Sequence, residues 1–109
     1  MEVKTSKEFF EKVLPAKFDP NKVVGLDVVV QLNITGSDGG DWMVSIKDQK
    51  LDVKQGVHPS PTITLTIADT DYVDVVNGKL GGERAFLTGK LKLKGSLAVA
   101  MKLREIGFI

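Results

Sequence analysis

One histidine and three closely spaced aspartates are the side chains whose types could support catalysis or metal binding in this sequence. His58 is followed two residues later by Ser60 in a proline-containing loop. Nucleophilic catalysis needs a base, a nucleophile and a group that orients the base, and the sequence around this pair offers no such context. Asp69, Asp71 and Asp74 could bind a cation, but no EF-hand spacing follows them, and negative charge is common where a helix begins. We therefore predict that the protein is not an enzyme and has no catalytic residues, no metal and no cofactor.

Composition places the chain among ordinary globular domains. Its 109 residues are 42% hydrophobic and 27% charged, which predicts a single domain over residues 1–109. A net charge of +1 argues against nucleic acid as a partner. The absence of cysteine excludes a disulfide scaffold and a thiolate nucleophile. The charged N-terminus does not resemble a signal peptide, and no apolar run approaches the roughly 18 residues that span a bilayer. We expect a cytoplasmic protein.

Four segments between residues 26 and 67 alternate apolar and polar residues with a period of two, as strands do. This pattern is typical of a mostly antiparallel sheet with one face in water, because strands covered on both faces read as continuous apolar runs. Lys90 to Lys94 forms a fifth alternating segment. The apolar residues of the first four segments are Leu26, Val28, Val30, Leu32, Ile34, Trp42, Val44, Ile46, Leu51, Val53, Ile63, Leu65 and Ile67.

Helix signals stand before and after these strands. Thr5 and Glu8 form a capping-box pattern at the start of an amphipathic helix, which Pro15 is expected to end or bend. Asp69 is the expected N-cap of a helix that Asn77-Gly78 ends.

Two further helices complete the predicted fold. Residues 83–88 are expected to form a short helix that Gly89 ends, and Gly95-Ser96 should cap a final helix. The predicted fold is α+β, a two-layer sandwich of a five-stranded, mostly antiparallel sheet with helices on one face.

The second half of the chain resembles the sterol carrier protein type 2 family of lipid-transfer domains. Three groups of residues carry the resemblance: Asp71, Tyr72, Val75, Val76, Gly78, Lys79 and Leu80; Ala85, Phe86, Thr88, Gly89, Lys90, Leu91 and Lys92; and Gly95, Ser96, Lys102 and Leu103. The strand with Trp42 and the leading amphipathic helix also match. The resemblance implies an internal hydrophobic tunnel between sheet and helices. It further implies a carrier that binds a long-chain fatty acid, a fatty acyl-coenzyme A or a sterol-like lipid without catalysis.

The chain differs from the animal members because it ends soon after its last helix, without their C-terminal extension and targeting tripeptide. We therefore expect a free-standing bacterial or archaeal member whose ligand has a linear acyl chain.

The ligand-binding residues that the resemblance implies are apolar. The candidates are Phe9, Val13, Trp42, Val44, Tyr72, Val76, Phe86, Leu87, Leu97 and Met101. The last four are the strongest candidates, and the flexible thioether of Met101 suits a surface that fits varied ligands. Ordinary core packing is the alternative for all of them, since apolar helix stripes mostly face a core.

Lys90, Lys92 and Lys94 have two interpretations. They are either part of a charged edge strand that resists aggregation or a contact for the acidic headgroups of an anionic membrane or for the phosphates of coenzyme A. For the whole protein, the alternative to a lipid carrier is a structural or oligomerisation module of the same fold with a filled core.

Overall fold

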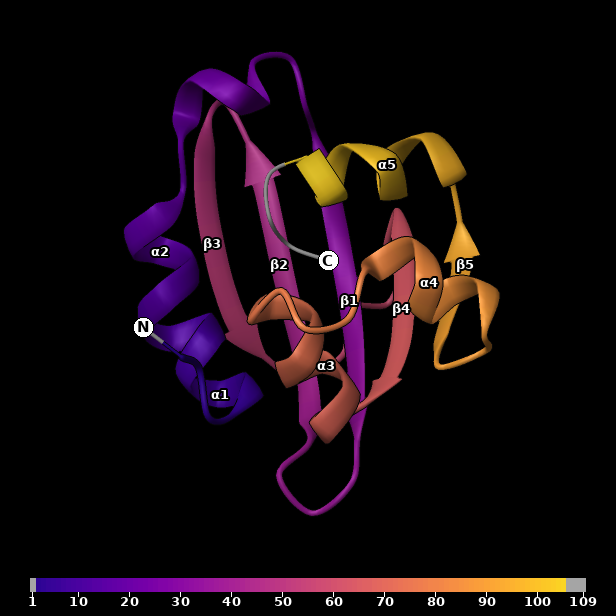
Figure 1. Ribbon diagram of the computed structural model, residues 1–109. Coiled ribbons are helices and arrows are strands. Elements are labelled where there is room, and N and C mark those ends of the chain that lie inside the picture. Colours follow the sequence, from indigo (N-terminus) through magenta and orange to yellow (C-terminus); the bar gives the residue numbers. More distant parts are fainter. Residues whose placement is uncertain (1, 106–109) are drawn as a thin grey trace.

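The computed structural model describes residues 2–105, and its elements occur in the predicted order of helix, four strands, two helices, strand and helix (Figure 1). None of the helices in this part of the chain is both long and apolar enough to cross a bilayer. The elements are α1 (Ser6–Glu8), η1 (Phe9–Val13), α2 (Leu14–Lys17), η2 (Pro20–Val23), β1 (Val28–Thr35), β2 (Gly40–Lys47), β3 (Lys50–Gln55), β4 (Ile63–Ala68), α3 (Asp69–Val76), α4 (Gly82–Leu87), β5 (Leu91–Gly95) and α5 (Leu97–Glu105).

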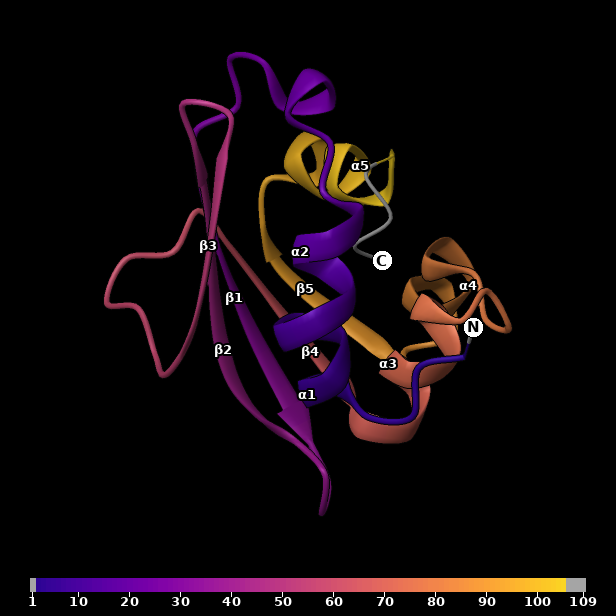
Figure 2. The ribbon, with the colours of Figure 1, turned by 90° about the vertical axis from the view of Figure 1, so that its left-hand side faces the viewer.

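The five strands form one mixed sheet in the order β3-β2-β1-β4-β5. Three of its four pairings are antiparallel, and β1 with β4 is the parallel one, in the register Val30 to Ile63. The helices lie on one face of this sheet (Figure 2). The prediction of a two-layer α+β sandwich with a mostly antiparallel sheet is therefore confirmed.

The alternation read from the sequence decides which side chains enter the core. In β1, β2 and β4, the predicted apolar face is buried from Val28 to Ile67. The opposite face of the sheet is only partly in water, because the loop between β3 and β4 crosses it (Figure 2).

Gln31 on β1 anchors this loop and is only 3% exposed. Its side-chain amide donates to the carbonyl of Gly56 at 3.1 Å and accepts from the backbone N–H of His58 at 2.7 Å. The His58 ring Nδ1 accepts from the backbone N–H of Ser60 at 3.0 Å. The expectation that this face lies in water does not hold at Gln31, because its buried amide satisfies loop groups that would otherwise lack partners.

The N-terminal helix begins as predicted but does not end at Pro15. The Thr5 hydroxyl accepts from the backbone N–H of Glu8 at 3.1 Å, and the Glu8 carboxylate accepts from the backbone N–H of Lys4 at 3.0 Å. The helix continues to Lys17 because a π-helical segment, η1, comes just before the proline. The wider π-helical turn changes the register of the backbone hydrogen bonds. It thereby accommodates the Pro15 ring and the backbone N–H that proline lacks.

Four aromatic rings join the N-terminal helix, α3 and the sheet. Phe10 lies at the centre of this aromatic cluster, with ring centroids 5.1 Å from Trp42, 5.5 Å from Phe9 and 5.5 Å from Tyr72. All four side chains are buried. Burial raises the pKa of Tyr72 well above its usual value, because the phenolate would lose its hydration.

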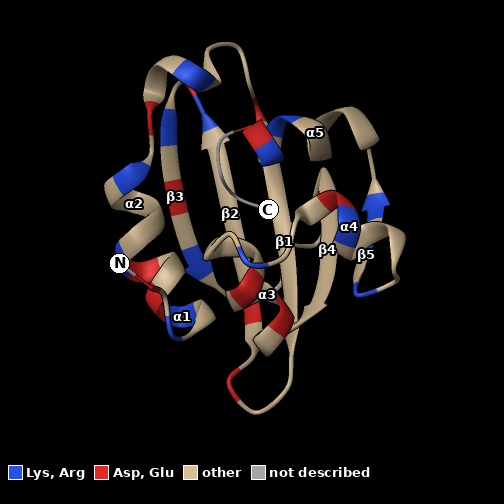
Figure 3. Ribbon diagram, in the orientation of Figure 1, with Lys and Arg blue, Asp and Glu red and all other residues tan. Residues whose placement is uncertain are grey.

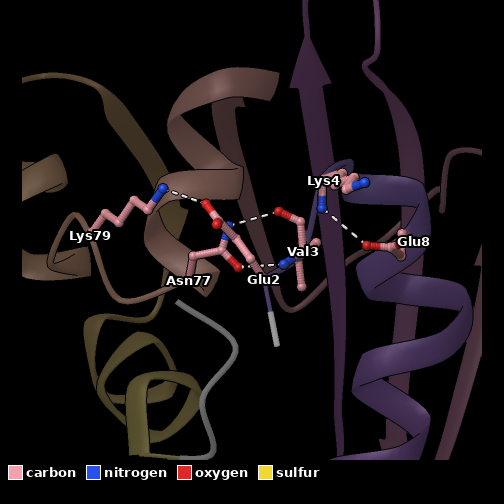
Figure 4. A network of polar contacts seen from close by, with 6 residues as sticks. All are labelled: Glu2, Val3, Lys4, Glu8, Asn77 and Lys79. Atoms are coloured by element: carbon pink, nitrogen blue, oxygen red, sulfur yellow. Dashed lines mark hydrogen bonds and ion pairs between the residues drawn. The ribbon is translucent and has the colours of Figure 1, made fainter.

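A second link fastens the N-terminus to the end of α3 (Figure 4). The Asn77 amide donates to the carbonyl of Val3 and accepts from its N–H, both at 2.7 Å. Beside it, Lys79 forms an ion pair with Glu2, which raises the lysine pKa and lowers the carboxyl pKa.

Asn77-Gly78 ends α3 as predicted, but Asp69 is not its N-cap. Ala68 is the N-cap, and the Asp69 carboxylate instead accepts from Asp38 in the β1–β2 loop at 2.9 Å.

Replacing Phe10 with alanine should remove the centre of the aromatic cluster. Truncating a buried phenylalanine costs about 3–5 kcal/mol, so we expect a loss of that size in the free energy of unfolding, measured by urea titration. Phe86→Ala is the matched control, because Phe86 is 43% exposed and its truncation should cost only about 1 kcal/mol. Equal losses in the two variants would show that the cluster does not organise the core.

Candidate functional site

The candidate site lies between α4, β5 and α5, and two glycines position these elements. Gly89 follows α4 with a φ of +80°, a conformation that glycine adopts without strain. The backbone N–H of Lys90 donates to the carbonyl of Ala85 at 2.9 Å, and that of Gly89 donates to Phe86 at 3.2 Å. These two bonds form a Schellman motif, which ends the helix and turns the chain into β5.

Gly95 makes the turn from β5 into α5. Its φ is +127°, and a Cβ atom at this position would lie 2.7 Å from the carbonyl oxygen of Thr62. The close approach holds the start of α5 against the beginning of β4. The Ser96 hydroxyl then accepts from the backbone N–H of Val99 at 3.3 Å, so the predicted cap at Gly95-Ser96 is confirmed.

These three elements border an open apolar pocket of about 410 Å³. This volume falls in the range of about 300–1,000 Å³ in which proteins bind small molecules. The residues that line it are Gly82, Glu83, Phe86, Leu87, Leu91, Leu93, Leu97, Ala100, Met101 and Arg104. Seven of the ten are apolar residues larger than glycine, so the walls are suited to hydrocarbon.

Large apolar side chains are exposed around this pocket. Phe86 is 43% exposed, Leu87 74%, Leu97 59% and Met101 61%. Among the described residues, the other large hydrophobic side chains that are this exposed are Val24 and Val57. Clustered exposed apolar surface usually marks a binding site, whereas scattered single residues do not.

The remaining side chains at the pocket carry charge. Arg104 on α5 forms an ion pair with Glu83 on α4, with 3.0 Å between the guanidinium Nη1 and the carboxylate Oε2. Both side chains are more than half exposed, so the pair belongs to the rim of the pocket. The sequence analysis did not identify this pair, because its partners are 21 residues apart in the chain.

The structure separates the ten predicted ligand-binding residues into two groups. Phe86, Leu87, Leu97 and Met101, the strongest candidates, all line the pocket. The other six lie in the core or against it, away from the pocket lining: Phe9, Val13, Trp42, Val44, Tyr72 and Val76. The internal tunnel is not seen in the described part of the chain, where the aromatic cluster occupies the interior beneath α3 and the pocket lies at the β5 edge.

None of the three candidate lysines lines the pocket. Two of them lie in β5, on the opposite face of the strand from the pocket, and the third precedes β5. Lys92 and Lys94 pair with Thr66 and Thr64 of β4, and they alternate with Leu91 and Leu93, which face the pocket. Lys90 precedes β5. β5 is an edge strand, as one of the two interpretations supposed.

Charge is unevenly distributed over the molecule. Residues 82–105 carry six basic and two acidic side chains, whereas the rest of the chain carries nine basic and twelve acidic ones. Figure 3 shows the acidic residues along α3 and blue residues on α4, β5 and α5. The elements that build the pocket are therefore positively charged within a nearly neutral protein.

No metal centre is evident in the part of the chain that the structure describes. Among residues 2–105 there is no group of three or more His, Cys, Asp or Glu side chains placed to hold an ion. Asp69, the first of the three aspartates, instead binds the β1–β2 loop and the N–H of Thr70.

The profile of the SCP-2 sterol transfer family matches residues 8–106. Hydroxysteroid dehydrogenase-like protein 2 of Mus musculus is 38% identical over 80 residues, which cover 72% of this chain and 16% of that protein. Sterol carrier protein 2 of Homo sapiens is 35% identical over 71 residues, covering 65% of this chain and 13% of that protein. The chain thus spans less than a fifth of the length of either relative.

Solved structures of sterol carrier proteins are similar to this chain over nearly its whole length. The solution structure of palmitated SCP2L2 from Aedes aegypti has a TM-score of 0.74 and 33% identity, covering 97% of this chain and 96% of that one. The crystal structure of Sterol Carrier Protein 2 Like 2 from the same organism has a TM-score of 0.72 and 34% identity, covering 92% and 94%.

Gly95→Ala should disturb the turn that positions α5. The new Cβ would meet the Thr62 carbonyl, and the positive φ disfavours alanine, so we expect a loss of about 1–3 kcal/mol in unfolding free energy. Gly81→Ala is the control, because Gly81 has a φ of −68° and its Cβ would meet nothing closer than 4.0 Å. This control should stay within about 1 kcal/mol of wild type. A Gly95→Ala protein as stable as the control would contradict this account of the turn.

Proposed function

Because the chain belongs to the SCP-2 sterol transfer family, we propose that it is a non-catalytic carrier that binds one hydrophobic lipid between α4, β5 and α5. The observation that carries this proposal is the pocket of about 410 Å³ with Phe86, Leu87, Leu97 and Met101 exposed around it. Leaving four large apolar side chains in water costs free energy, which a bound hydrocarbon chain recovers.

A linear acyl chain is the ligand that we favour, as a fatty acid or a fatty acyl-coenzyme A, ahead of a sterol. Each buried methylene contributes about 0.8 kcal/mol, so ten contribute roughly 8 kcal/mol. Association costs at least about 4 kcal/mol, which leaves a net gain for a chain of this length. The similarity to a palmitated protein from Aedes aegypti, at 33% identity, supports the choice of a fatty acid.

A structural or oligomerisation module is the second candidate function. It is favoured by the small share of the relatives' length that the chain covers, 16% in the mouse protein. In such a module, the apolar surface at the pocket would be covered by another protein surface. Mass spectrometry of organic extracts distinguishes the two, since a carrier should co-purify with lipid. A protein without lipid that dimerises through Leu87 and Leu97 would favour the module.

Leu97→Glu should abolish uptake of a fluorescent long-chain fatty acid. Placing an unpaired carboxylate against an apolar ligand costs several kcal/mol, enough to reduce affinity more than a hundredfold. Leu97 is 59% exposed and stands in the first turn of α5, where negative charge is tolerated, so the variant should fold.

Val57→Glu is the matched control, because Val57 is 67% exposed and lies in the β3–β4 loop, away from the pocket. It should bind the fatty acid as the wild type does, and circular dichroism should show both variants folded. Normal binding by a folded Leu97→Glu protein would exclude this pocket as the site.

A further inference from the structure

The rim of the pocket suggests which end of the lipid it recognises. Eight of the ten lining residues are apolar or glycine, and Glu83 and Arg104 are the two with charged side chains. Their ion pair joins α4 to α5 across the rim. Any polar headgroup of a chain bound against Phe86 and Met101 must therefore be accommodated near this pair or be left in water.

The position of Arg104 on its helix places it next to the apolar wall. It follows Ala100 by four residues and Met101 by three, and residues at these spacings share one helix face. Its side chain lines the same pocket as theirs. An acyl chain lying against Met101 would thus bring its first carbon atoms close to the guanidinium.

The Glu83 partner already demonstrates what the guanidinium can bind here. One carboxylate oxygen lies 3.0 Å from Nη1 of Arg104. Arginine presents a planar set of donors that matches a carboxylate and can bind it through two parallel hydrogen bonds. Because the pair is exposed, it contributes little to stability and can be exchanged at small cost.

From this geometry we infer that Arg104 is the headgroup receptor for an anionic lipid and that Glu83 occupies its guanidinium when no ligand is bound. The ligand carboxylate displaces the Glu83 carboxylate from Arg104, and the displaced side chain turns into solvent. The excess of basic residues over positions 82–105 also attracts an anionic ligand toward this pocket. The pocket therefore selects acids over neutral lipids of equal chain length. This inference rests on the proposed function.

The test compares dodecanoate with 1-dodecanol, which have the same chain length and differ in headgroup charge. Binding of both probes is measured by calorimetry for the wild type, Arg104→Gln and Glu83→Gln. Arg104→Gln should weaken dodecanoate binding about tenfold, the effect of one charge-assisted hydrogen bond, and leave 1-dodecanol within about twofold. Glu83→Gln should strengthen dodecanoate binding by about two- to fivefold, because it removes the competing carboxylate.

Lys102→Gln is the matched control for charge. Lys102 lies on the same helix and pairs with Glu105 at 3.4 Å, but it does not line the pocket. It should bind both probes as the wild type does. Arg104→Lys should recover part of the preference for the acid, because it keeps the charge but loses the planar donors.

Nuclear magnetic resonance of dodecanoate labelled with carbon-13 at the carboxyl provides an independent readout. A nearby cation stabilises the carboxylate, so the bound acid should titrate at lower pH in the wild type than in Arg104→Gln.

The possible failures are distinguishable. If Arg104→Gln weakens both probes equally or neither, or if Glu83→Gln weakens dodecanoate, the headgroup assignment is wrong while the lipid carrier stands. If Lys102→Gln matches Arg104→Gln, general charge attraction explains the preference, and the assignment is again wrong. If the wild type binds neither probe, the proposed function itself is overturned.

Discussion

The packing of Phe10 against Phe9, Trp42 and Tyr72 determines where this protein can contain empty space. Aromatic rings are the bulkiest apolar groups available, and four of them in contact fill the region where the N-terminal helix, α3 and the sheet meet. At the other end of the helical layer, α4 buries Ala85, and α5 buries Ala100 and Leu103. None of the buried aromatic rings in the described part of the chain belongs to α4, β5 or α5, and the pocket lies among these elements. The aromatic end of the same layer is closed.

Sequence periodicity predicted the elements well because each signal is local. Alternation over β1, β2 and β4, the capping box at Thr5 and the glycine stops at Gly78 and Gly89 depend on neighbouring residues alone. Two of the errors came from distant partners. Asp69 looked like an N-cap but binds a loop 31 residues away, and Gln31 is buried by a loop that begins 25 residues later.

The same limit applies to the site. Periodicity identifies residues that leave water but cannot distinguish a filled interior from a hollow one. Phe9 and Trp42 therefore had the same pattern as Phe86 and Leu97, although only the second pair lines the pocket. The ion pair between Glu83 and Arg104 was not predictable, because each residue alone resembles an ordinary solvated charge. What made Phe86, Leu87, Leu97 and Met101 the better candidates was the density of family-like residues around them, which is information about relatives rather than about packing.

The aromatic cluster and the pocket that we propose as the lipid site lie in different parts of this chain. The aromatic cluster draws on η1, β2 and α3, whereas every residue that lines the pocket lies between Gly82 and Arg104. A substitution in α4 or α5 that changes the pocket wall leaves the rings beneath α3 untouched, and effects at sites that share no partners add independently. If the pocket is the lipid site, as we propose, the ligand can be changed by altering one short segment while the rest of the fold is maintained. This division is consistent with a fold that persists at 33% identity, with a TM-score of 0.74 to the palmitated protein from Aedes aegypti.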